Sequence, residues 1–205
     1  MPLGLDVTAF DLAGQPVSWA EFLGFVAGVA SVALVAAQRV ETFPVGIAGN
    51  VLWLILFADV ALYADAALQI VFIALSAMGW WAWLRLGPQR TELEVSDASA
   101  RLLLLTGAVV VAGTLILVPV LRAAHGSAPF LDALTTSLSL GAMLLMNLKK
   151  VQHWYVWMVA DVIYVPLYLD RGLYLTAFVY TVFFALCIAG LLRWRRAPRP
   201  VEAIA

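Results

Sequence analysis

The fold is decided by the stretch VLWLILFADVALYADAALQIVFIALSAMGWWAW (51–83), whose pattern recurs in VIYVPLYLDRGLYLTAFVYTVFFALCIAGLLRW (162–194). Laid on each other without a gap, at an offset of 111 residues, the two stretches match at twelve positions. Shared apolar composition raises such a count, yet several matched residues are acidic, aromatic or glycine. These are Asp59 with Asp170, Phe72 with Phe183, Gly79 with Gly190, and Trp83 with Trp194. The chain therefore contains an internal repeat.

The composition places these stretches in a membrane. Of the 205 residues, 64% are hydrophobic and 12% charged, whereas soluble domains carry about 45–50% apolar and about 25% charged residues. A helix needs about 20 mostly apolar residues to cross the hydrocarbon core, and a barrel would show alternating segments of about 10 residues. The sequence predicts an all-α membrane protein with seven transmembrane helices, at 20–38, 42–60, 63–84, 101–121, 131–147, 151–169 and 172–193.

Basic residues indicate the orientation, because Lys and Arg near membrane spans concentrate on the cytoplasmic side. If the C-terminal run RWRRAPR (193–199) is inside, ten of the twelve basic residues are cytoplasmic. They are Arg39, Arg85, Arg90, Arg101, Lys149, Lys150, Arg193, Arg195, Arg196 and Arg199. Only Arg122 and Arg171 then face outward. We expect a multi-pass protein of the inner (cytoplasmic) membrane with its N-terminus outside, its C-terminus in the cytoplasm and no cleaved signal peptide.

The repeat also defines the architecture. The offset carries the first three spans (20–84) onto the last three (131–194), with 101–121 between them as a linker helix. Four spans separate corresponding helices, so both halves enter the membrane in the same direction. This is a parallel 3+1+3 repeat, the SWEET-like arrangement, and we expect one membrane domain over 1–205. In such folds the substrate site lies near the bilayer midplane between the halves.

Polar and aromatic side chains mark a candidate site on the sixth span. Trp154, Trp157, Asp161, Tyr164 and Tyr168 share one helical face. Ionisable groups at bilayer depth usually face a cavity or one another. An aromatic stripe that contains a carboxylate suits a flat, polar or cationic ring, which stacks on the aromatic faces. The alternative is that the stripe packs against other helices.

The offset extends this site to the other half. It places Asn50 opposite Asp161, and Gln69 on the third span opposite Tyr180 on the seventh. Gln69 is notable because a buried amide needs several hydrogen-bond partners. We therefore predict a substrate-binding set of seven residues: Gln69, Trp154, Trp157, Asp161, Asn50, Tyr164 and Tyr180.

Other residues near the cytoplasmic side have simpler explanations. The run that contains Trp80, Trp81 and Trp83 predicts an anchoring girdle at the membrane interface. Trp154 is also close enough to that interface to belong to an aromatic belt. His153 is expected to be an interfacial histidine, with a proton-relay role as the alternative.

Several classes of function are not supported. Cys187 is the single cysteine and lies inside the last span, which favours packing and predicts neither disulfides nor a metal site. No cofactor is expected, and a net charge of −1 makes nucleic acid an unexpected partner. An intramembrane enzyme is the rival class, but H-E-x-x-H and G-x-S-x-G are both absent. A receptor or scaffold without transport remains a second rival.

The pattern Trp154-x-x-Trp157-x-x-x-Asp161 resembles the signature of the Pnu-type vitamin transporters. The segments LYADAALQ (62–69) and GWWAW (79–83) are similar to other helices of that family, and the resemblance covers roughly residues 20–196. It is greatest for the PnuC branch, which imports nicotinamide riboside. Where that motif has asparagine before its first tryptophan, this chain has His153.

The resemblance implies that Gln69, Trp154, Trp157 and Asp161 contact the substrate. It implies a homotrimer that works by facilitated diffusion, with a cytoplasmic riboside kinase trapping the imported substrate for NAD synthesis. Related transporters take thiamine or riboflavin, which are the alternative substrates. Proton-coupled transport is a further alternative that depends on Asp161 alone.

Overall fold

The computed structural model describes residues 7–12, 14–59, 63–86, 93–124, 128–170, 172 and 174–196. Arg90, Arg171 and Arg199, which enter the orientation argument, lie outside the described residues. Within these ranges there are seven helices, one at each predicted span. They are α1 (Trp19–Ala36), α2 (Thr42–Asp59), α3 (Tyr63–Arg85), α4 (Ala100–Ala123), α5 (Pro129–Asn147), α6 (His153–Asp170) and α7 (Tyr174–Arg195).

Four of the helices, α3, α4, α5 and α7, are by themselves long and apolar enough to cross a membrane. The apolar parts of α1 and α2, Glu21–Ala36 and Thr42–Ala58, are shorter. The helix α6 carries the polar and aromatic stripe, which lowers its hydropathy. The protein is thus an all-helical membrane protein.

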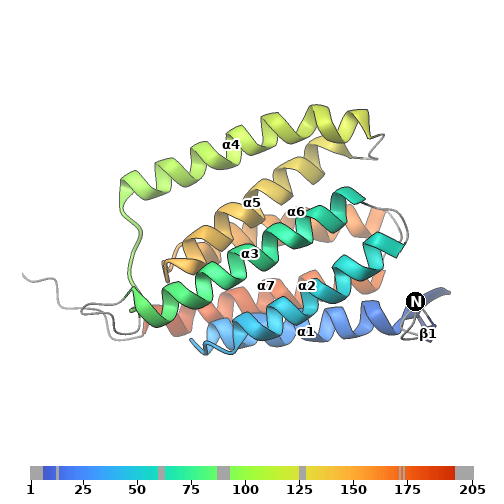
Figure 1. Ribbon diagram of the computed structural model, residues 1–205, viewed down its shortest axis with the longest axis horizontal. Helices are drawn as coiled ribbons and strands as arrows, with labels where there is room; N and C mark the ends of the chain where they lie inside the picture. Colours follow the sequence, from blue (N-terminus) through green and yellow to red (C-terminus); the bar gives the residue numbers. More distant parts are fainter. Residues whose placement is uncertain are drawn as a thin grey trace, which may run out of the picture.

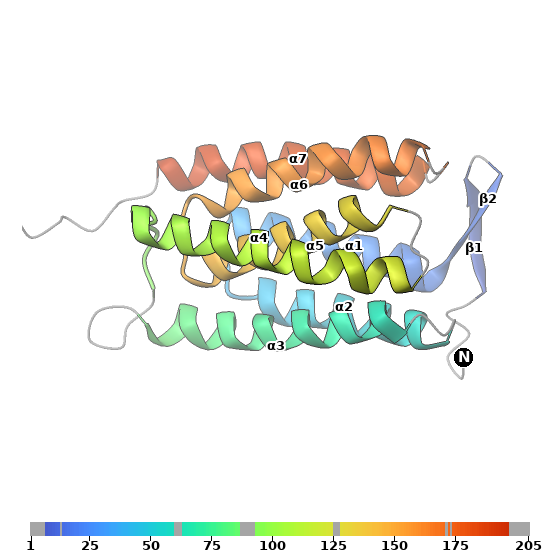
Figure 2. The ribbon, with the colours of Figure 1, turned by 90° about the horizontal axis from the view of Figure 1, so that it is seen from above.

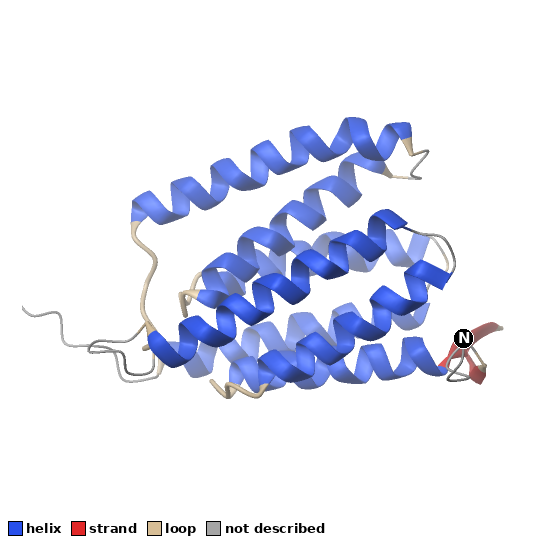
Figure 3. Ribbon diagram, in the orientation of Figure 1, coloured by secondary structure: helices blue, strands red, loops and turns tan. Residues whose placement is uncertain are grey.

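A short hairpin that the sequence did not predict precedes α1. Its antiparallel strands are β1 (Thr8–Leu12) and β2 (Gln15–Ser18), at one end of the helices (Figure 3). The last hairpin residue, Ser18, caps α1: Glu21 N donates to Ser18 Oγ at 3.2 Å, and Ser18 N donates to the Glu21 carboxylate at 2.9 Å. This reciprocal pair is a capping box, which fixes where α1 begins.

Six helices form a closed ring. Around it α1 packs on α2, α2 on α3, α3 on α5, α5 on α6, α6 on α7, and α7 on α1 (Figures 1 and 2). The first half (α1, α2 and α3) and the second half (α5, α6 and α7) therefore meet at two seams, α3–α5 and α7–α1. The helix α4 lies outside the ring, against α5 (Figure 1).

The 111-residue offset recurs in the backbone of the two helix connections. At α1–α2, Gln38 has φ 58°; at α5–α6, Lys149 has φ 50°. In the first connection Gln38 N donates to Val35 O and Arg39 N to Leu34 O. In the second, each of these bonds has its counterpart 111 residues later, from Lys149 to Met146 and from Lys150 to Leu145. This is the Schellman motif, in which a left-handed residue ends the helix and satisfies its last carbonyls.

Buried tryptophans join the halves at the end of the ring that holds these connections, here called the connection end. Trp83 Nε1 on α3 donates to Met146 O on α5 at 3.0 Å, and Trp194 Nε1 on α7 donates to Val35 O on α1 at 2.9 Å. The two donors are 111 residues apart in the sequence, and so are the two acceptors. The two indole centroids are 6.0 Å apart, so the rings meet between the halves. Of the expected girdle, Trp80 and Trp81 are exposed, but the prediction for Trp83 was wrong, because α7 covers it.

The segment 93–99, which leads into α4, is bonded to the α5–α6 connection. Lys149 Nζ donates to Leu93 O at 2.8 Å and Lys150 Nζ to Ser96 Oγ at 2.7 Å. Gln152 accepts from Ala98 N at 2.7 Å. The entry to α4 is therefore attached to the second half.

Candidate substrate-binding cavity

A cavity of about 580 Å³ lies inside the ring of six helices. All six contribute to its lining, and none of the described α4 residues does. Its volume is in the range of small-molecule sites, about 300–1,000 Å³. The structure brings to this one cavity all of the predicted binding residues: Gln69, Trp154, Trp157, Asp161, Asn50, Tyr164 and Tyr180. Their role in binding stays a prediction.

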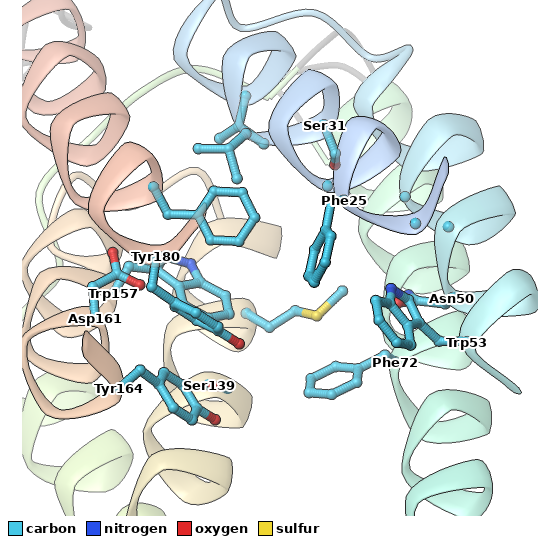
Figure 4. A pocket seen from close by; sticks show the side chains of 18 of the residues that line it. Phe25, Ser31, Asn50, Trp53, Phe72, Ser139, Trp157, Asp161, Tyr164 and Tyr180 are labelled. Atoms are coloured by element: carbon cyan, nitrogen blue, oxygen red, sulfur yellow. The ribbon is translucent and has the colours of Figure 1, made fainter. Parts of the chain in front are cut away.

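The second half supplies a wall of tyrosines. Tyr164 and Tyr168 on α6 stack at 5.5 Å between ring centroids, with 15° between their planes. Tyr180 on α7 lies 4.4 Å from Tyr164 and 5.3 Å from Tyr168 (Figure 4). Trp157 and Asp161 lie beside Tyr180 on the same side of the cavity (Figure 4). Flat rings arranged in this way offer faces on which an aromatic substrate can stack.

The first half supplies a second aromatic wall across the cavity. Trp53 and Phe57 on α2 stack at 5.5 Å with an angle of 27°, and they are the offset counterparts of Tyr164 and Tyr168. Asn50 lies beside Trp53, facing the tyrosine wall (Figure 4). Both halves therefore present a stacked aromatic pair next to a polar residue.

Sequence reasoning missed other aromatic residues in the lining, among them Phe25, Phe72 and Phe183. Phe25 lies edge-on to Trp53 at 5.5 Å, and Phe183 is edge-on to Tyr180 at 5.5 Å. The sequence did single out one pair of these residues, because Phe72 and Phe183 occupy matching positions in the repeat. That match alone does not show that the rings point into the cavity.

Asp161 is buried at the tyrosine wall. Its carboxylate accepts from the thiol of Cys187 on α7 at 3.7 Å, which is a weak donor. Cys187 is therefore more than a small packing residue. The offset counterparts of this pair, Asn50 and Ser76, also line the cavity. The only charged side chains that line it, among the described residues, are Asp161 and Glu21, and this excess of negative charge favours a cationic ligand.

His153 and Trp154 lie at the connection end of the cavity and are fully buried, so neither is interfacial as expected. Trp154 packs edge-on against Trp194 at 5.6 Å. His153 Nδ1 lies 2.7 Å from Lys150 O and so donates to it, which leaves Nε2 as an acceptor. Within the described part of the chain, His153 Nε2 and Trp154 Nε1 have no hydrogen-bond partner. Such buried polar atoms can pair with a ligand.

Comparison with known proteins decides the family. The family model for the nicotinamide mononucleotide transporter matches residues 18–196. This chain belongs to that family. The predicted resemblance to the Pnu-type transporters is thereby confirmed.

Individual members of the family differ in the substrates their names record. The nicotinamide riboside transporter PnuC of Escherichia coli (strain K12) is 27% identical, over 91% of this chain and 89% of its own length. The riboflavin/roseoflavin transporter RibM of Streptomyces davaonensis is 29% identical over 96% of both chains. The crystal structure of the vitamin B3 transporter PnuC matches with a TM-score of 0.67 and 22% identity, over 86% of this chain and 80% of that one. This structural likeness shows that the two chains share a fold.

Proposed function

We propose that this protein imports nicotinamide riboside across the bacterial inner membrane. The observation that carries the proposal is the cavity inside the ring, where aromatic walls from both halves flank the buried Asp161. The pyridinium ring of the riboside is flat and positively charged, so it gains from stacking and from the carboxylate. Membership of a family of transporters and the PnuC relatives support transport over an enzyme or a receptor.

The charge of the cavity favours the riboside over the phosphorylated mononucleotide in the family's name. A phosphate monoester needs cationic or strong hydrogen-bond donors. Among the described lining residues there is no Lys or Arg, and the charged ones, Glu21 and Asp161, would repel phosphate.

The burial of Trp154 changes which residues can stack on the substrate. Its ring is covered by His153 and Trp194, so its face is not available to a ligand. We place the pyridinium against Trp157 and the tyrosine wall instead. Asn50 and Gln69 then bond the carboxamide or the ribose hydroxyls, and Trp154 contributes its indole N–H.

Riboflavin is the second candidate, because RibM matches nearly the whole chain. The cavity volume admits it, but its ring system is neutral and gains less from Asp161. Thiamine is cationic and aromatic, so charge does not separate it from the riboside.

We further propose that the chain is a single membrane domain built as a parallel 3+1+3 repeat of seven spans, with the connection end in the cytoplasm. The paired Schellman motifs and tryptophan hydrogen bonds, all related by one offset, support the repeat. The basic residues near the connections support the orientation. A homotrimer that works by facilitated diffusion, with a riboside kinase trapping the substrate for NAD synthesis, completes the proposal.

Calorimetric binding to the purified protein tests the substrate. We expect affinity for nicotinamide riboside, weaker affinity for riboflavin, and no binding of nicotinamide mononucleotide; thiamine is measured alongside them. A wild-type protein that does not bind the riboside overturns the proposed function. Uptake into liposomes should continue when the proton gradient is collapsed, and loss of uptake would establish proton coupling through a group such as Asp161.

A further inference from the structure

Glycines replace larger residues on the first-half side of the cavity. Four of them, on α1 and α2, line it. They are Gly24, Gly28, Gly46 and Gly49, and their offset counterparts are Thr135, Ser139, Trp157 and Ala160. At these four positions the first half therefore has no side chain, whereas the second half has one.

Packing explains three of these glycines. A Cβ atom on Gly24 would lie 2.6 Å from Trp53 Nε1, closer than real contacts allow. On Gly28 it would lie 3.2 Å from the Phe183 ring, and on Gly49 it would lie 3.2 Å from the Cβ of Ala27. At each of these positions a neighbouring side chain occupies the space that the glycine leaves.

Packing also constrains Gly46, through a single hydroxyl group. A Cβ atom there would have one neighbour within 4 Å, Ser31 Oγ at 3.2 Å. That hydroxyl is already paired with Thr42 Oγ1 at 2.9 Å. Gly46 lies inside α2, where glycine is less favourable than alanine. On one side the Gly46 backbone therefore meets α1 at Ser31, and on the other it lines the cavity.

The counterpart of Gly46 is Trp157, the ring on which we place the substrate. Gly46 is one helical turn before Asn50, so both lie on one face of α2. Asn50 lies on the opposite side of the cavity from Trp157 and Asp161 (Figure 4). Gly46 and Trp157 thus line the same cavity from opposite halves.

We infer that Gly46 determines the size of the aromatic ring that the cavity admits. The inference rests on the proposed function and concerns the same site. The substrate ring lies between the Trp157 indole on one wall and the α2 backbone on the other. A side chain at position 46 occupies the space next to the α2 backbone. It therefore excludes substrates with large rings before those with small rings.

Graded substitutions test the inference in the full-length protein, with nicotinamide riboside as the probe. We expect Gly46→Ala to weaken binding by about tenfold and Gly46→Val by about a hundredfold, since one added methylene in a pocket is worth about 10–200-fold. Gly107→Val is the matched control, because Gly107 lies on α4 outside the ring and a Cβ there meets nothing within 4 Å. It should bind as the wild type does.

The outcomes separate the two proposals. Wild-type affinity in Gly46→Val, or an equal loss in Gly107→Val, overturns the role of Gly46. Absence of riboside binding in the wild type overturns the proposed function instead. Melting temperature and gel filtration report whether each variant is folded.

If Gly46→Val does not fold, Gly46→Ala keeps the test decisive, and wild-type affinity in that variant overturns the role of Gly46. An exchange of the two positions gives a second test. The double variant Gly46→Trp/Trp157→Gly returns one indole to the cavity, on the opposite wall. We expect it to bind the riboside more tightly than Gly46→Trp alone. Equal or weaker binding in the double variant contradicts the inference.

Discussion

Asp161 combines burial, a weak thiol partner and a place beside the tyrosine wall. Asparagine has the same shape without the charge, and an amide already occupies the counterpart position, Asn50. We expect Asp161→Asn to fold normally and to weaken riboside binding by about tenfold, because a cation loses about 1–2 kcal/mol without its desolvated carboxylate. Binding of the neutral riboflavin should change little. Equal losses for both ligands would contradict a charge-based role.

Trp157 should contribute through stacking. We expect Trp157→Ala to lower the binding free energy of the riboside by about 1–3 kcal/mol, the scale of stacking between bases and aromatic side chains. Trp81→Ala is the control, because Trp81 is 60% exposed and lies outside the cavity lining. Calorimetry on both variants measures the difference. An unchanged affinity in Trp157→Ala would mean that this residue only packs.

Most of the candidate site could be predicted from the sequence. The helical period specifies which residues share a helix face, and the 111-residue offset specifies their counterparts in the other half. They do not specify burial. The run Trp80, Trp81 and Trp83 is uniform in sequence. Only the packing of α2, α5 and α7 around Trp83 separates it from its exposed neighbours. Trp154, for which an aromatic belt was the alternative to substrate binding, is buried as well. Its replacement by alanine should cost about 3–5 kcal/mol of stability, so it is unsuitable as a test of binding.

The paired connections allow a prediction at the scale of elements. Gln38 and Lys149 both adopt a left-handed backbone, which glycine adopts without strain. Gln38→Gly should therefore be neutral or stabilising by up to about 1 kcal/mol. Lys149→Gly gains the same backbone freedom but loses the bond from Lys149 Nζ to Leu93 O. We expect it to lower the melting temperature, and a rise equal to that of Gln38→Gly would show that this bond contributes nothing.

The tryptophan hydrogen bonds at the two seams should be equivalent in energy. Trp83→Phe and Trp194→Phe each remove one of the two donors to a buried carbonyl, which keeps its backbone bond from Lys149 N or Gln38 N. The loss of one such hydrogen bond costs about 0.5–1.5 kcal/mol. We expect similar losses in melting temperature for both variants and little change for Trp81→Phe. A large difference between the first two would mean that the seams are not equivalent.

The positions of the helices were predicted well, since long apolar segments leave few alternatives. The hairpin at 8–18 was missed because five- and four-residue strands give almost no periodic pattern. The closed ring was also beyond the sequence, because the offset relates the halves without showing which helices form the seams.

Orientation is a property of the whole molecule and can be tested directly. In a Cys187→Ala background, Glu41→Cys lies in the α1–α2 connection and Asp11→Cys in the hairpin, and both positions are exposed. We expect an impermeant thiol reagent applied outside intact cells to label position 11 and not position 41. The reverse pattern would place the N-terminus inside.

The attachment of segment 93–99 to the α5–α6 connection has a mechanical consequence. The helix α4 packs on α5 and is tied at its entry to that connection by two lysine side chains, whereas one backbone bond, from Leu93 N to Trp83 O, joins the entry to α3. The contacts therefore favour movement of α4 with the second half. Any tilting between the halves then rotates a three-helix body against a four-helix body. The larger body holds Asp161 and Trp157, and the smaller one holds Gly46. A substrate held between Trp157 and Gly46 would therefore change its contacts whenever the two bodies tilt.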